Sequence, residues 1–361
     1  MKKTGIILVV IVTIVLGMIF FSRNKKNIPL PSELGIIELK PEVIIDPEEE
    51  RDPHYLLHKP GEIKIDRDGN IYILDSGNHR IMVYDREMRF IRQIGRLGQG
   101  PGELIRPTDF DIDNAGNVYI ISFWNRRISI FDRRGKFIKS INVNYSIPME
   151  AHLAVDSRGM IYLNTIYTDS LIVVIDTNGK KVRTLGKPIN SKIFPYDYNI
   201  VSLECDESDN LWVCFNNRPR IRKYGPDGNL IFNKRINSFQ INRMLEEEKE
   251  KDKKRPHYYT YFTDIECCDN NIIYICGNDY IYEIDSDGNI VREYIHKPIY
   301  KDDEPIPLTI DWLVCYKETE KFLCIDNFGD YLFILHFCTF RSEHVPLDLN
   351  KKNSYLTLKQ L

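Results

Sequence analysis

The 361-residue sequence predicts an all-β protein in which a unit of four short strands repeats around a ring. One observation is a frame, apolar-x-Ile-Asp-x-x-Gly-Asn-x-Tyr-Ile, that occurs at Ile63–Ile73 and again at Phe110–Ile120. Another is the aromatic residue of this frame, which recurs at intervals of 43 to 62 residues. A period of about 40–50 residues with four strands per unit is typical of a β-propeller blade.

Six copies of the unit follow one another. They occupy Ile63–Gly95, Phe110–Ile141, Leu153–Gly186, Leu203–Ile236, Ile265–Tyr294 and, in a degraded form, Trp312–Phe337. Their equivalent aromatic residues are Tyr72, Tyr119, Tyr162, Trp212, Tyr274 and Phe322. The sequence therefore predicts a six-bladed β-propeller over residues 61–361.

Each unit carries its own turn signals. In Asp-x-x-Gly-Asn the glycine tolerates a positive φ, and the Asp or Asn side chain bonds the nearby backbone, so the motif joins the first strand to the second. A later Asp-x-x-Gly, as in "DRRGKF" (Asp132–Phe137), joins the third strand to the fourth. Between the turns the apolar residues alternate or run together, as in strands that are packed on both faces.

Residues 1–22 differ from the rest of the chain. Thr4–Ser22 is a run of 19 residues without a charge, close to the ~20 that cross a bilayer as a helix. A cleaved signal peptide is the alternative, but its apolar region is usually about 7–15 residues and ends at a small-x-small site, which is missing here. We expect an uncleaved single-pass membrane anchor with the propeller on the extracytoplasmic side.

Residues 23–60 are polar and rich in proline, and they are expected to form a stalk. The stalk contains one strand-like segment, Gly35–Ile45. A propeller whose last blade lacks a strand has an open edge, and an N-terminal strand can cover it. Gly35–Ile45 is therefore the candidate to close the ring.

The motifs "DRDGNIYILDSGNHRIMVYD" (Asp66–Asp85), "GRLGQGPGEL" (Gly95–Leu104) and "NRRISIFDRRGKFI" (Asn125–Ile138) resemble those of bacterial NHL-repeat, six-bladed propeller proteins. The resemblance is strong over residues 61–186 and fades toward the C-terminus. It implies a ring with a central channel, and such proteins often carry an export signal or a lipoprotein anchor. It does not imply one activity, since one propeller frame serves binding, lyase, lactonase and scaffold roles.

Gly95–Leu104 contains four glycines and could be taken for a phosphate-binding loop. A dinucleotide fingerprint needs a helix after the glycines, and here Pro101, Pro107 and another strand follow. The segment lies between the first and second blades, where the chain returns from the outer strand to the centre. We interpret it as a structural joint.

The loops between the second and third strands repeat an Asn-x-Arg element. If the repeated residues cap the loop and bond neighbouring carbonyls, they are structural. The alternative is that these loops form a basic, aromatic pocket for an anion or a carbohydrate near the channel mouth. The candidate residues for this pocket are His79, Arg80, Trp124, Asn125, Arg126, Arg127 and Arg218.

A metal site over the channel is a further hypothesis, because metal-dependent lactonase and lyase propellers hold an ion there with acidic, Asn or His ligands. Oxygen-rich rings of this kind suit calcium, and zinc is the alternative. The residues that could contribute lie at blade entries: Glu62, Asp109, Glu150, His152, Asp264 and Asp311. No spacing rule connects them, so surface acids without a metal are the competing interpretation.

Cysteines recur at equivalent positions in three blades, in the pairs Cys205/Cys214, Cys267/Cys276 and Cys315/Cys324. The matching residues in the first two blades are aliphatic, so cysteine replaces core residues there. Diagonal neighbours across a hairpin normally lie too far apart for a disulfide. We expect free, mostly buried thiols and no zinc site made of cysteines.

An insertion at Phe239–Phe262 accounts for the longest interval between aromatic residues. Its segment "RMLEEEKEKDKKR" (Arg243–Arg255) has acids early and bases late, which favours a solvated surface helix ending before Pro256. The following "HYYTYF" (His257–Phe262) is a candidate to line the channel mouth.

The leading functional prediction is a non-catalytic binding module for a protein, peptide or glycan, with no cofactor. The alternative is a metal-dependent lactonase or lyase with its site at the central channel. A net charge of −3 and the expected membrane span argue against nucleic acid as a partner.

Overall fold

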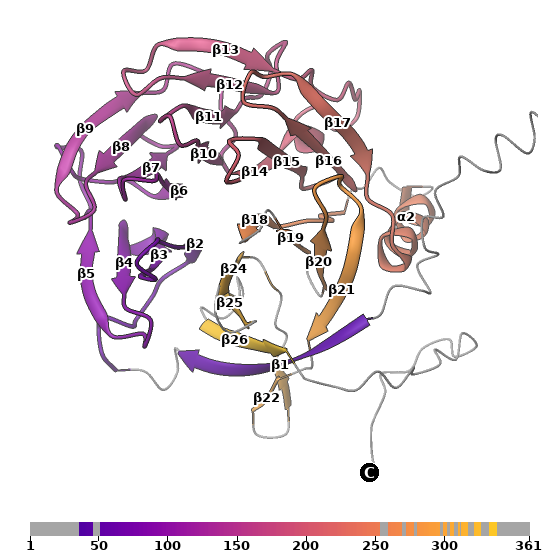
Figure 1. Ribbon diagram of the computed structural model, residues 1–361, viewed down its shortest axis with the longest axis horizontal. Coiled ribbons are helices and arrows are strands. Elements are labelled where there is room, and N and C mark those ends of the chain that lie inside the picture. The colour runs from indigo at the N-terminus through magenta and orange to yellow at the C-terminus, as the bar shows by residue number, and fades with distance from the viewer. Residues whose placement is uncertain are drawn as a thin grey trace, which may run out of the picture.

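The computed structural model describes residues 36–45, 51–252 and 259–337, the last range with short gaps at 269–271, 278–279, 297–298, 302–303, 307–309, 311, 317–320 and 326–331. Six four-stranded blades surround a central channel (Figure 1). The expected anchor, residues 1–22, lies outside the described residues. Among the residues that the structure describes, no helix is both long and apolar enough to cross a membrane.

The first three blades are separate antiparallel sheets. The strands of blade 1 are β2 (Pro60–Ile65), β3 (Ile71–Asp75), β4 (Arg80–Tyr84) and β5 (Phe90–Ile94). Those of blade 2 are β6 (Pro107–Ile112), β7 (Val118–Ser122), β8 (Arg127–Phe131) and β9 (Phe137–Asn142). Those of blade 3 are β10 (Leu153–Val155), β11 (Ile161–Asn164), β12 (Ile172–Ile175) and β13 (Lys181–Leu185). In each blade the first strand is nearest the channel (Figure 1).

The last three blades follow the same order. Blade 4 consists of β14 (Val201–Cys205), β15 (Leu211–Phe215), β16 (Arg220–Tyr224) and β17 (Leu230–Arg235). Blade 5 consists of β18 (Asp264–Cys268), β19 (Ile272–Gly277), β20 (Tyr280–Ile284) and β21 (Ile290–His296). Blade 6 consists of β24 (Trp312–Tyr316), β25 (Lys321–Ile325), β26 (Leu332–Phe337) and an N-terminal strand, β1 (Ile36–Ile45).

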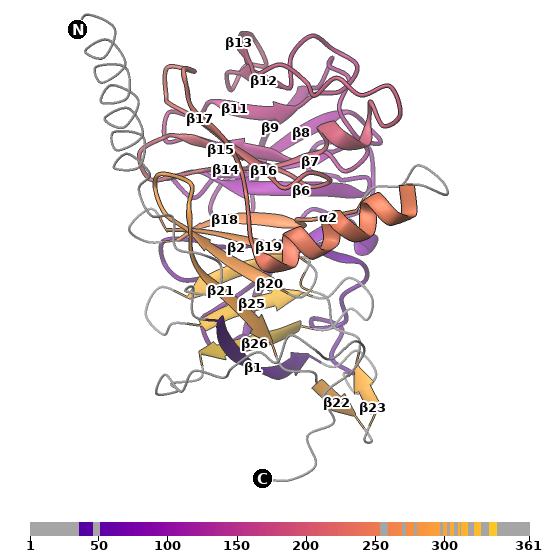
Figure 2. The same ribbon diagram turned by 90° about the vertical axis from the view of Figure 1, so that its right-hand side faces the viewer.

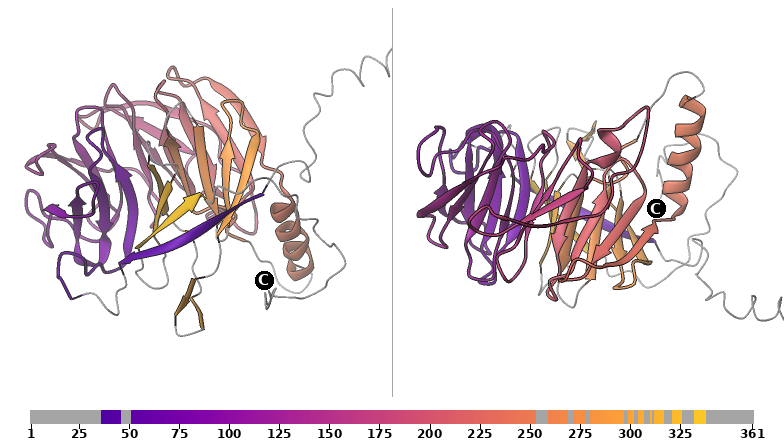
Figure 3. Two further views of the ribbon diagram at one scale, coloured as in Figure 1. Left: turned by 60° about the horizontal axis from the view of Figure 1, so that its bottom comes forward. Right: turned by 90° about the horizontal axis from the view of Figure 1, so that it is seen from above.

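Strand β1 completes the ring. Its second half runs antiparallel to β26, with Leu39 opposite Phe337, and its first half runs parallel to β21, with Leu39 opposite His296. Blades 5 and 6 thereby become one eight-stranded sheet, and β1 lies along both of them (Figure 3). The segment that was predicted to close the ring, Gly35–Ile45, therefore lies at the open edge of the sixth blade. Its pairing there removes an exposed strand edge.

The core is divided into six hydrophobic clusters, one between each pair of neighbouring blades. Between blades 1 and 2, Tyr72 and Phe110 are fully buried with their ring centroids 6.5 Å apart. Between blades 6 and 1, Leu323 packs in one cluster with Ile63 and Ile71. Because every blade is buried on both faces, its strands are almost continuously apolar.

The Asp-x-x-Gly-Asn turns form as the sequence predicts. The Oδ1 atom of Asp66 accepts hydrogen bonds from the backbone N–H groups of Asp68 and Asn70, at 2.9 and 2.8 Å. Gly69 has a φ of +82°. In blade 4 a non-glycine residue, Asp209, takes the same place with a φ of +60°.

Gly95–Leu104 is a joint, as expected. Gly95 has a φ of +79°, and a Cβ there would come within 2.4 Å of the side chain of Leu104. Leu104 is fully buried between blades 1 and 2. The guanidinium of Arg127 donates to the backbone oxygens of Gln99 and Glu103, at 3.1 and 2.6 Å. The loop is therefore filled by the protein's own side chains.

Residues 51–59, which the sequence assigns to the stalk, lie against blade 1. Tyr84 donates its hydroxyl hydrogen to the oxygen of His54 at 2.7 Å, and Tyr55 donates to the oxygen of Met88 at 2.9 Å. The end of the expected stalk is thus part of the propeller body.

The insertion forms helix α2 (Phe239–Asp252) on the outer side of the ring (Figure 2). The expected surface helix forms, and most of its charged residues are exposed. One side packs on the ring, because Ile241 is buried and Tyr261 donates a hydrogen bond to the buried Glu248 at 2.7 Å. Tyr261 and Phe262 belong to the cluster between blades 4 and 5 rather than to the channel mouth. His257 and Tyr258 lie outside the described residues.

Candidate functional site

The channel has two mouths, which we call the turn face and the loop face. The turn face carries the Asp-x-x-Gly turns such as Asp66–Asn70. The loop face carries the loops between second and third strands, such as Ser76–Asn78, and there the inner strands begin, since Pro60 pairs with Asp75. Charged residues occur along the inner strands from one mouth to the other.

A cation in the channel is supplied by Lys64 of β2. Its Nζ donates to Glu204 of β14 and to Glu266 of β18, each at 2.7 Å, and all three side chains are buried. Asp111 lies at the equivalent position of β6. We call Lys64, Asp111, Glu204 and Glu266 the lysine layer. It holds three carboxylates for one ammonium group.

The excess of carboxylates over ammonium groups in the lysine layer accompanies shifted pKa values of its members. Burial raises the pKa of Glu266 to about 7, although Lys64 opposes the shift. Burial also raises the pKa of Glu204 well above its usual range. Burial alone would lower the pKa of Lys64, but Glu204 and Glu266 reverse this and raise it. Lys64 therefore stays charged, while the acids share too little positive charge to be fully ionised near neutrality.

Several inner-strand aspartates connect neighbouring blades. Asp109 accepts from the backbone N–H of Phe110 at 2.8 Å and from that of Leu153, in the next blade, at 2.7 Å. Asp111 binds the N–H groups of Ile112 and Val155 in the same way, both at 2.7 Å. These acids have a structural role, since each satisfies backbone donors of two inner strands.

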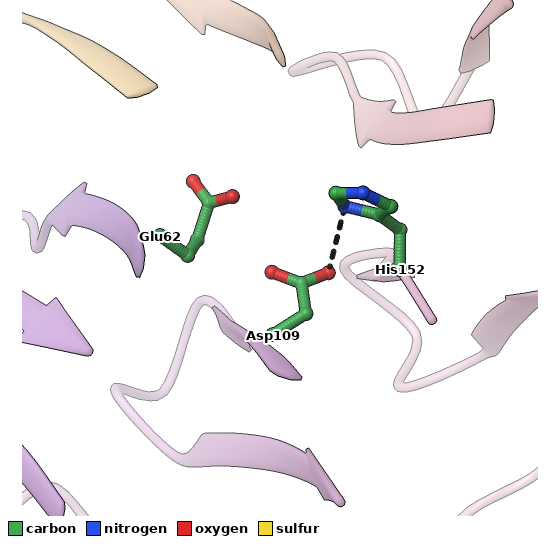
Figure 4. Close-up of side chains that lie close together, drawn as sticks. All are labelled: Glu62, Asp109 and His152. Carbon is green, nitrogen blue, oxygen red and sulfur yellow. Dashed lines mark ion pairs between the residues drawn. The ribbon is translucent and has the colours of Figure 1, made fainter. Parts of the chain in front are cut away.

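A second charged group lies at the loop face, and we call Glu62, Asp109 and His152 the loop-face cluster. Glu62 lies on β2, Asp109 on β6 and His152 directly before β10. One ligand atom of each lies within 4.8 Å of the others. His152 Nδ1 is 3.5 Å from Asp109 Oδ2, and the three side chains approach one another from different blades (Figure 4).

The loop-face cluster is poor in positive charge. Glu62 is 3% exposed, and its Oε1 has no hydrogen-bond partner among the described residues. The ammonium of Lys64 is 3.7 Å from this oxygen. Burial, followed by the charge of Asp264, raises the pKa of Glu62 well above its usual range. Burial acts to lower the pKa of His152, but the hydrogen bond and charge of Asp109 raise it.

The other expected metal ligands behave differently. Asp264 is buried and accepts from the backbone N–H groups of Ile265 at 2.7 Å and Leu313 at 3.3 Å, like Asp109 in its own blade. Burial raises its pKa to about 6. Glu150 is exposed and accepts a hydrogen bond from Tyr196 at 2.9 Å. Asp311 lies outside the described residues.

The candidate arginines of the loop face are bound to their own scaffold. Arg80 Nε donates to the fully buried Asp75 at 2.7 Å. Arg127 binds the carbonyls of the Gly95–Leu104 joint. Arg126 donates to the backbone oxygens of Val143 at 3.3 Å and Tyr145 at 2.7 Å. These contacts agree with the structural interpretation of the repeated element.

The remaining loop candidates are spread over the face. His79 Nδ1 accepts from the backbone N–H of Arg106 at 2.8 Å. The guanidinium of Arg106 lies over the ring of Trp124, which is 55% exposed, at 5.8 Å. Arg218 stacks on Tyr198 at 3.6 Å. Arg106 therefore links His79 of blade 1 to Trp124 of blade 2, whereas Arg218 lies in blade 4.

Asn125 shows how one substitution changes the repeat. In blade 1 the equivalent Asn78 donates to Asp75 at 3.0 Å. In blade 2 the position of Asp75 is taken by Ser122, because Ser122 pairs with Arg127 as Asp75 pairs with Arg80. The buried amide atoms of Asn125 and the Oγ of Ser122 therefore lack hydrogen-bond partners within the described part of the chain.

At the turn face the channel opens into a cavity of about 1010 Å³. Its lining includes the lysine layer, together with turn residues of blades 1 to 4. The rim cations are partly satisfied, since Arg133 pairs with Asp68 at 2.9 Å and Arg92 donates to the oxygen of Arg133 at 2.7 Å. This cavity was not predicted from the sequence. The signal was a charged residue in the middle of a central strand, as in "IKI" (Ile63–Ile65) and "IEC" (Ile265–Cys267).

Cysteines also line the cavity, namely Cys205, Cys267, Cys268 and Cys315. All seven described cysteines are free, which confirms that prediction, and Cys338 lies outside the described residues. Only the second member of each expected pair is core: Cys214, Cys276 and Cys324 are fully buried. The first members are half-buried at the cavity, because the inner strand turns that side toward the channel.

Comparisons with known proteins agree with this architecture. Residues 51–226 match the model of a family described as 6-bladed beta-propeller. No curated protein matches the chain. The chain is therefore a six-bladed β-propeller protein, as its repeats predict; the match does not carry the NHL label.

Solved structures share the fold at low identity. A putative exported protein from Bacteroides fragilis is 14% identical, with a TM-score of 0.54 over 84% of this chain and 100% of that one. A catalytically inactive virginiamycin B lyase from Staphylococcus aureus, with quinupristin, is 12% identical, with a TM-score of 0.54 over 83% of this chain and 100% of that one. A streptogramin B lyase is 12% identical, with a TM-score of 0.50 over 78% and 94%. At such identities these similarities concern the fold alone.

Proposed function

We propose that the chain is a membrane-anchored binding module whose propeller, on the extracytoplasmic side, takes a peptide segment bearing an amine or a guanidinium group. The observation that carries the proposal is the turn-face cavity with the lysine layer as its floor. The floor has three carboxylates for one ammonium group, so an entering cation gains favourable electrostatic interaction in a partly desolvated site.

The shape of the cavity supports a ligand of side-chain to short-peptide size. Its volume of about 1010 Å³ is at the upper end of the ~300–1,000 Å³ of ordinary ligand sites. Most turn aspartates at the rim are occupied by their own backbone, as Asp66 is. The charge that remains available is on the floor, which favours a ligand that inserts one long basic side chain.

The exported location is supported by the sequence. Thr4–Ser22 is long enough to span a bilayer and carries no charge. The similar protein from Bacteroides fragilis is named as a putative exported protein. Cell fractionation and protease treatment of intact cells test this part: the full chain should be in the membrane fraction and its propeller accessible from outside. Recovery of the protein in the cytosol contradicts it.

The ligand proposal can be tested with the full chain in detergent micelles. Short peptides with lysine, acetyl-lysine or arginine at the centre are titrated by calorimetry, with an amino-sugar oligosaccharide as the competing class. Lysine or arginine peptides should bind, and acetylation should abolish binding. Equal binding of the acetylated peptide, or binding of the oligosaccharide alone, rejects the proposed ligand.

A matched pair of variants locates the binding. Glu207 is exposed and lines the cavity, whereas Glu246 is exposed on helix α2. Glu207→Gln should weaken binding up to about fivefold, the effect of a partly exposed ion pair of 0–1 kcal/mol. Glu246→Gln should leave it unchanged.

A second candidate function is metal-dependent lactone hydrolysis or elimination at the channel. The observation that favours it is the loop-face cluster, which combines two carboxylates with one imidazole. A substrate screen with lactones tests it, with Glu62→Gln and His152→Asn as the inactive variants. Turnover that is unaffected by both substitutions excludes this site.

A further inference from the structure

We propose that Glu62, Asp109 and His152 bind one divalent transition-metal ion, with zinc as the best match, at the loop-face mouth of the channel. The ammonium of Lys64 separates this cluster from the turn-face cavity, and the three residues are not part of the cavity lining. The metal site is therefore independent of the proposed peptide site.

The spacing of the donors fits a metal. Two ligands of a tetrahedral zinc ion with bonds of about 2.0–2.1 Å lie roughly 3.4 Å apart. His152 Nδ1 and Asp109 Oδ2 already lie 3.5 Å apart. The third donor is within 4.8 Å of both, so a modest rotation of the Glu62 side chain completes the set. Three protein ligands leave a fourth position for water or a substrate atom.

Glu62 provides a second, independent observation. Its Oε1 is buried and accepts no hydrogen bond from the part of the chain that the structure describes, and the residue is only 3% exposed. The only charge partner of this oxygen among the described residues is the ammonium of Lys64, at 3.7 Å, which is too far for a hydrogen bond. A buried carboxylate oxygen without a hydrogen bond is costly, and metal coordination is one of the few arrangements that satisfies it. In contrast to Glu204 and Glu266, which each lie 2.7 Å from Lys64 Nζ, Glu62 is 3.7 Å from it. No hydrogen bond of that oxygen has to break when a metal enters.

The surroundings would hold the ligands in place. The backbone N–H groups of Phe110 and Leu153 fix the Asp109 carboxylate. Such outer contacts orient metal ligands and typically change affinity by about 10–100-fold when removed. Asp264 acts electrostatically on both Glu62 and His152, which adds negative charge beside the ion.

The type and number of the ligand atoms determine which metal ion the loop-face cluster should prefer. An imidazole with two carboxylates suits zinc and neighbouring transition metals, whereas calcium takes about six to eight oxygen ligands. Zinc is therefore expected to bind more tightly than calcium.

The test uses the full chain in detergent micelles, stripped with a chelator and then titrated with zinc chloride alone. Equilibrium dialysis with elemental analysis should give one zinc ion per chain, and cobalt chloride should give a visible absorption spectrum of low coordination number. Glu62→Gln and His152→Asn should each weaken zinc binding by at least about tenfold. Circular dichroism melting of the metal-free variants verifies that they are folded.

Two controls come from the same face of the ring. Asp169→Asn removes an exposed carboxylate from the loop between β11 and β12, and His79→Gln removes an imidazole that binds the backbone of Arg106. Neither should change zinc affinity more than about twofold. The proposal is overturned if the wild type binds no zinc at micromolar concentration, if calcium displaces zinc at equal concentration, or if the controls weaken binding as much as Glu62→Gln and His152→Asn.

Discussion

The lysine layer and the loop-face cluster occupy the same channel, yet they treat buried carboxylates in opposite ways. Glu204 and Glu266 each accept a hydrogen bond of 2.7 Å from one ammonium group. At the loop face, Oε1 of Glu62 accepts no hydrogen bond from the described residues. The imidazole of His152 lies 3.5 Å from the carboxylate of Asp109 instead. One half of the channel therefore carries its own cation, and we propose that the other half receives one.

Removing the internal cation gives the largest expected effect. Lys64→Met leaves the carboxylates of Glu204 and Glu266 buried without their ammonium partner, whereas Asp111 keeps its two backbone N–H donors. Breaking a buried ion pair in this way costs about 3–5 kcal/mol of unfolding free energy. Urea unfolding at pH 7.5 measures it, with the exposed Lys136→Met as the control. A loss smaller than that of the control contradicts an ammonium-centred layer.

The pH dependence of stability is the next largest effect. The pKa of Glu266 in the folded protein, about 7, is above the ordinary value of 4.5. The folded state therefore holds a proton that the unfolded state releases between these values, and stability falls as the pH rises through this window. A shift of this size corresponds to about 2–3 kcal/mol between pH 4.5 and 7.5.

Urea unfolding of the metal-free protein at several pH values measures that slope. Glu266→Gln should make it shallower, because the titrating group is gone. Stability that rises from pH 5 to pH 7.5 in the metal-free wild type would show that the channel acids are fully compensated.

Neutralising the orphan carboxylate should change stability in the other direction. In metal-free protein, Glu62→Gln replaces a buried carboxyl group whose ionisation is disfavoured, and no hydrogen bond of Oε1 within the described residues is lost. We expect the free energy of unfolding at pH 7.5 to stay constant or rise by about 1 kcal/mol. A chemical denaturation series compares it with Glu150→Gln, which should have no effect. If Glu62→Gln lowers the free energy of unfolding by more than about 1 kcal/mol, the Glu62 carboxylate makes a favourable interaction inside the channel and the expectation is wrong.

The smallest effect is expected for an ion pair outside the channel. Arg133 and Asp68 lie 2.9 Å apart, but their side chains are 66% and 64% exposed. Arg133→Met should cost no more than about 1 kcal/mol, and less in high salt. The same unfolding assay in low and high salt measures it. If Arg133→Met lowers the free energy of unfolding as much as Lys64→Met does, the burial of the ion pair does not determine its contribution to stability.

The fold was readable from the sequence because each blade repeats its own local chemistry. Asp66 and Gly69 specify a turn by themselves, and the equivalent residues repeat that turn in blades 2, 3 and 4. The closing strand was also predictable, because Gly35–Ile45 is the one strand-like segment predicted between the expected anchor and the repeats. The burial of one side of helix α2 was harder to predict, because Ile241 packs in a cluster of residues from blades 4 and 5 that no local pattern in the helix marks.

The candidate site could be predicted only in part. Glu62, Asp109 and His152 were selected by their places at blade entries, and the ring brings them together. The role of Asp109 and Asp264 as links between blades was missed, because it depends on backbone N–H groups of the next blade. The pairing of Lys64 with Glu204 and Glu266 spans 140 and 202 residues of sequence, and no local pattern encodes it.

The most direct test of the difference between the two regions is anomalous diffraction at the zinc edge, from crystals of the full chain soaked in zinc chloride. We expect a single strong peak between Glu62, Asp109 and His152, and no peak among Lys64, Glu204 and Glu266. A peak in the lysine layer, or no peak at the loop-face cluster, would contradict this expectation.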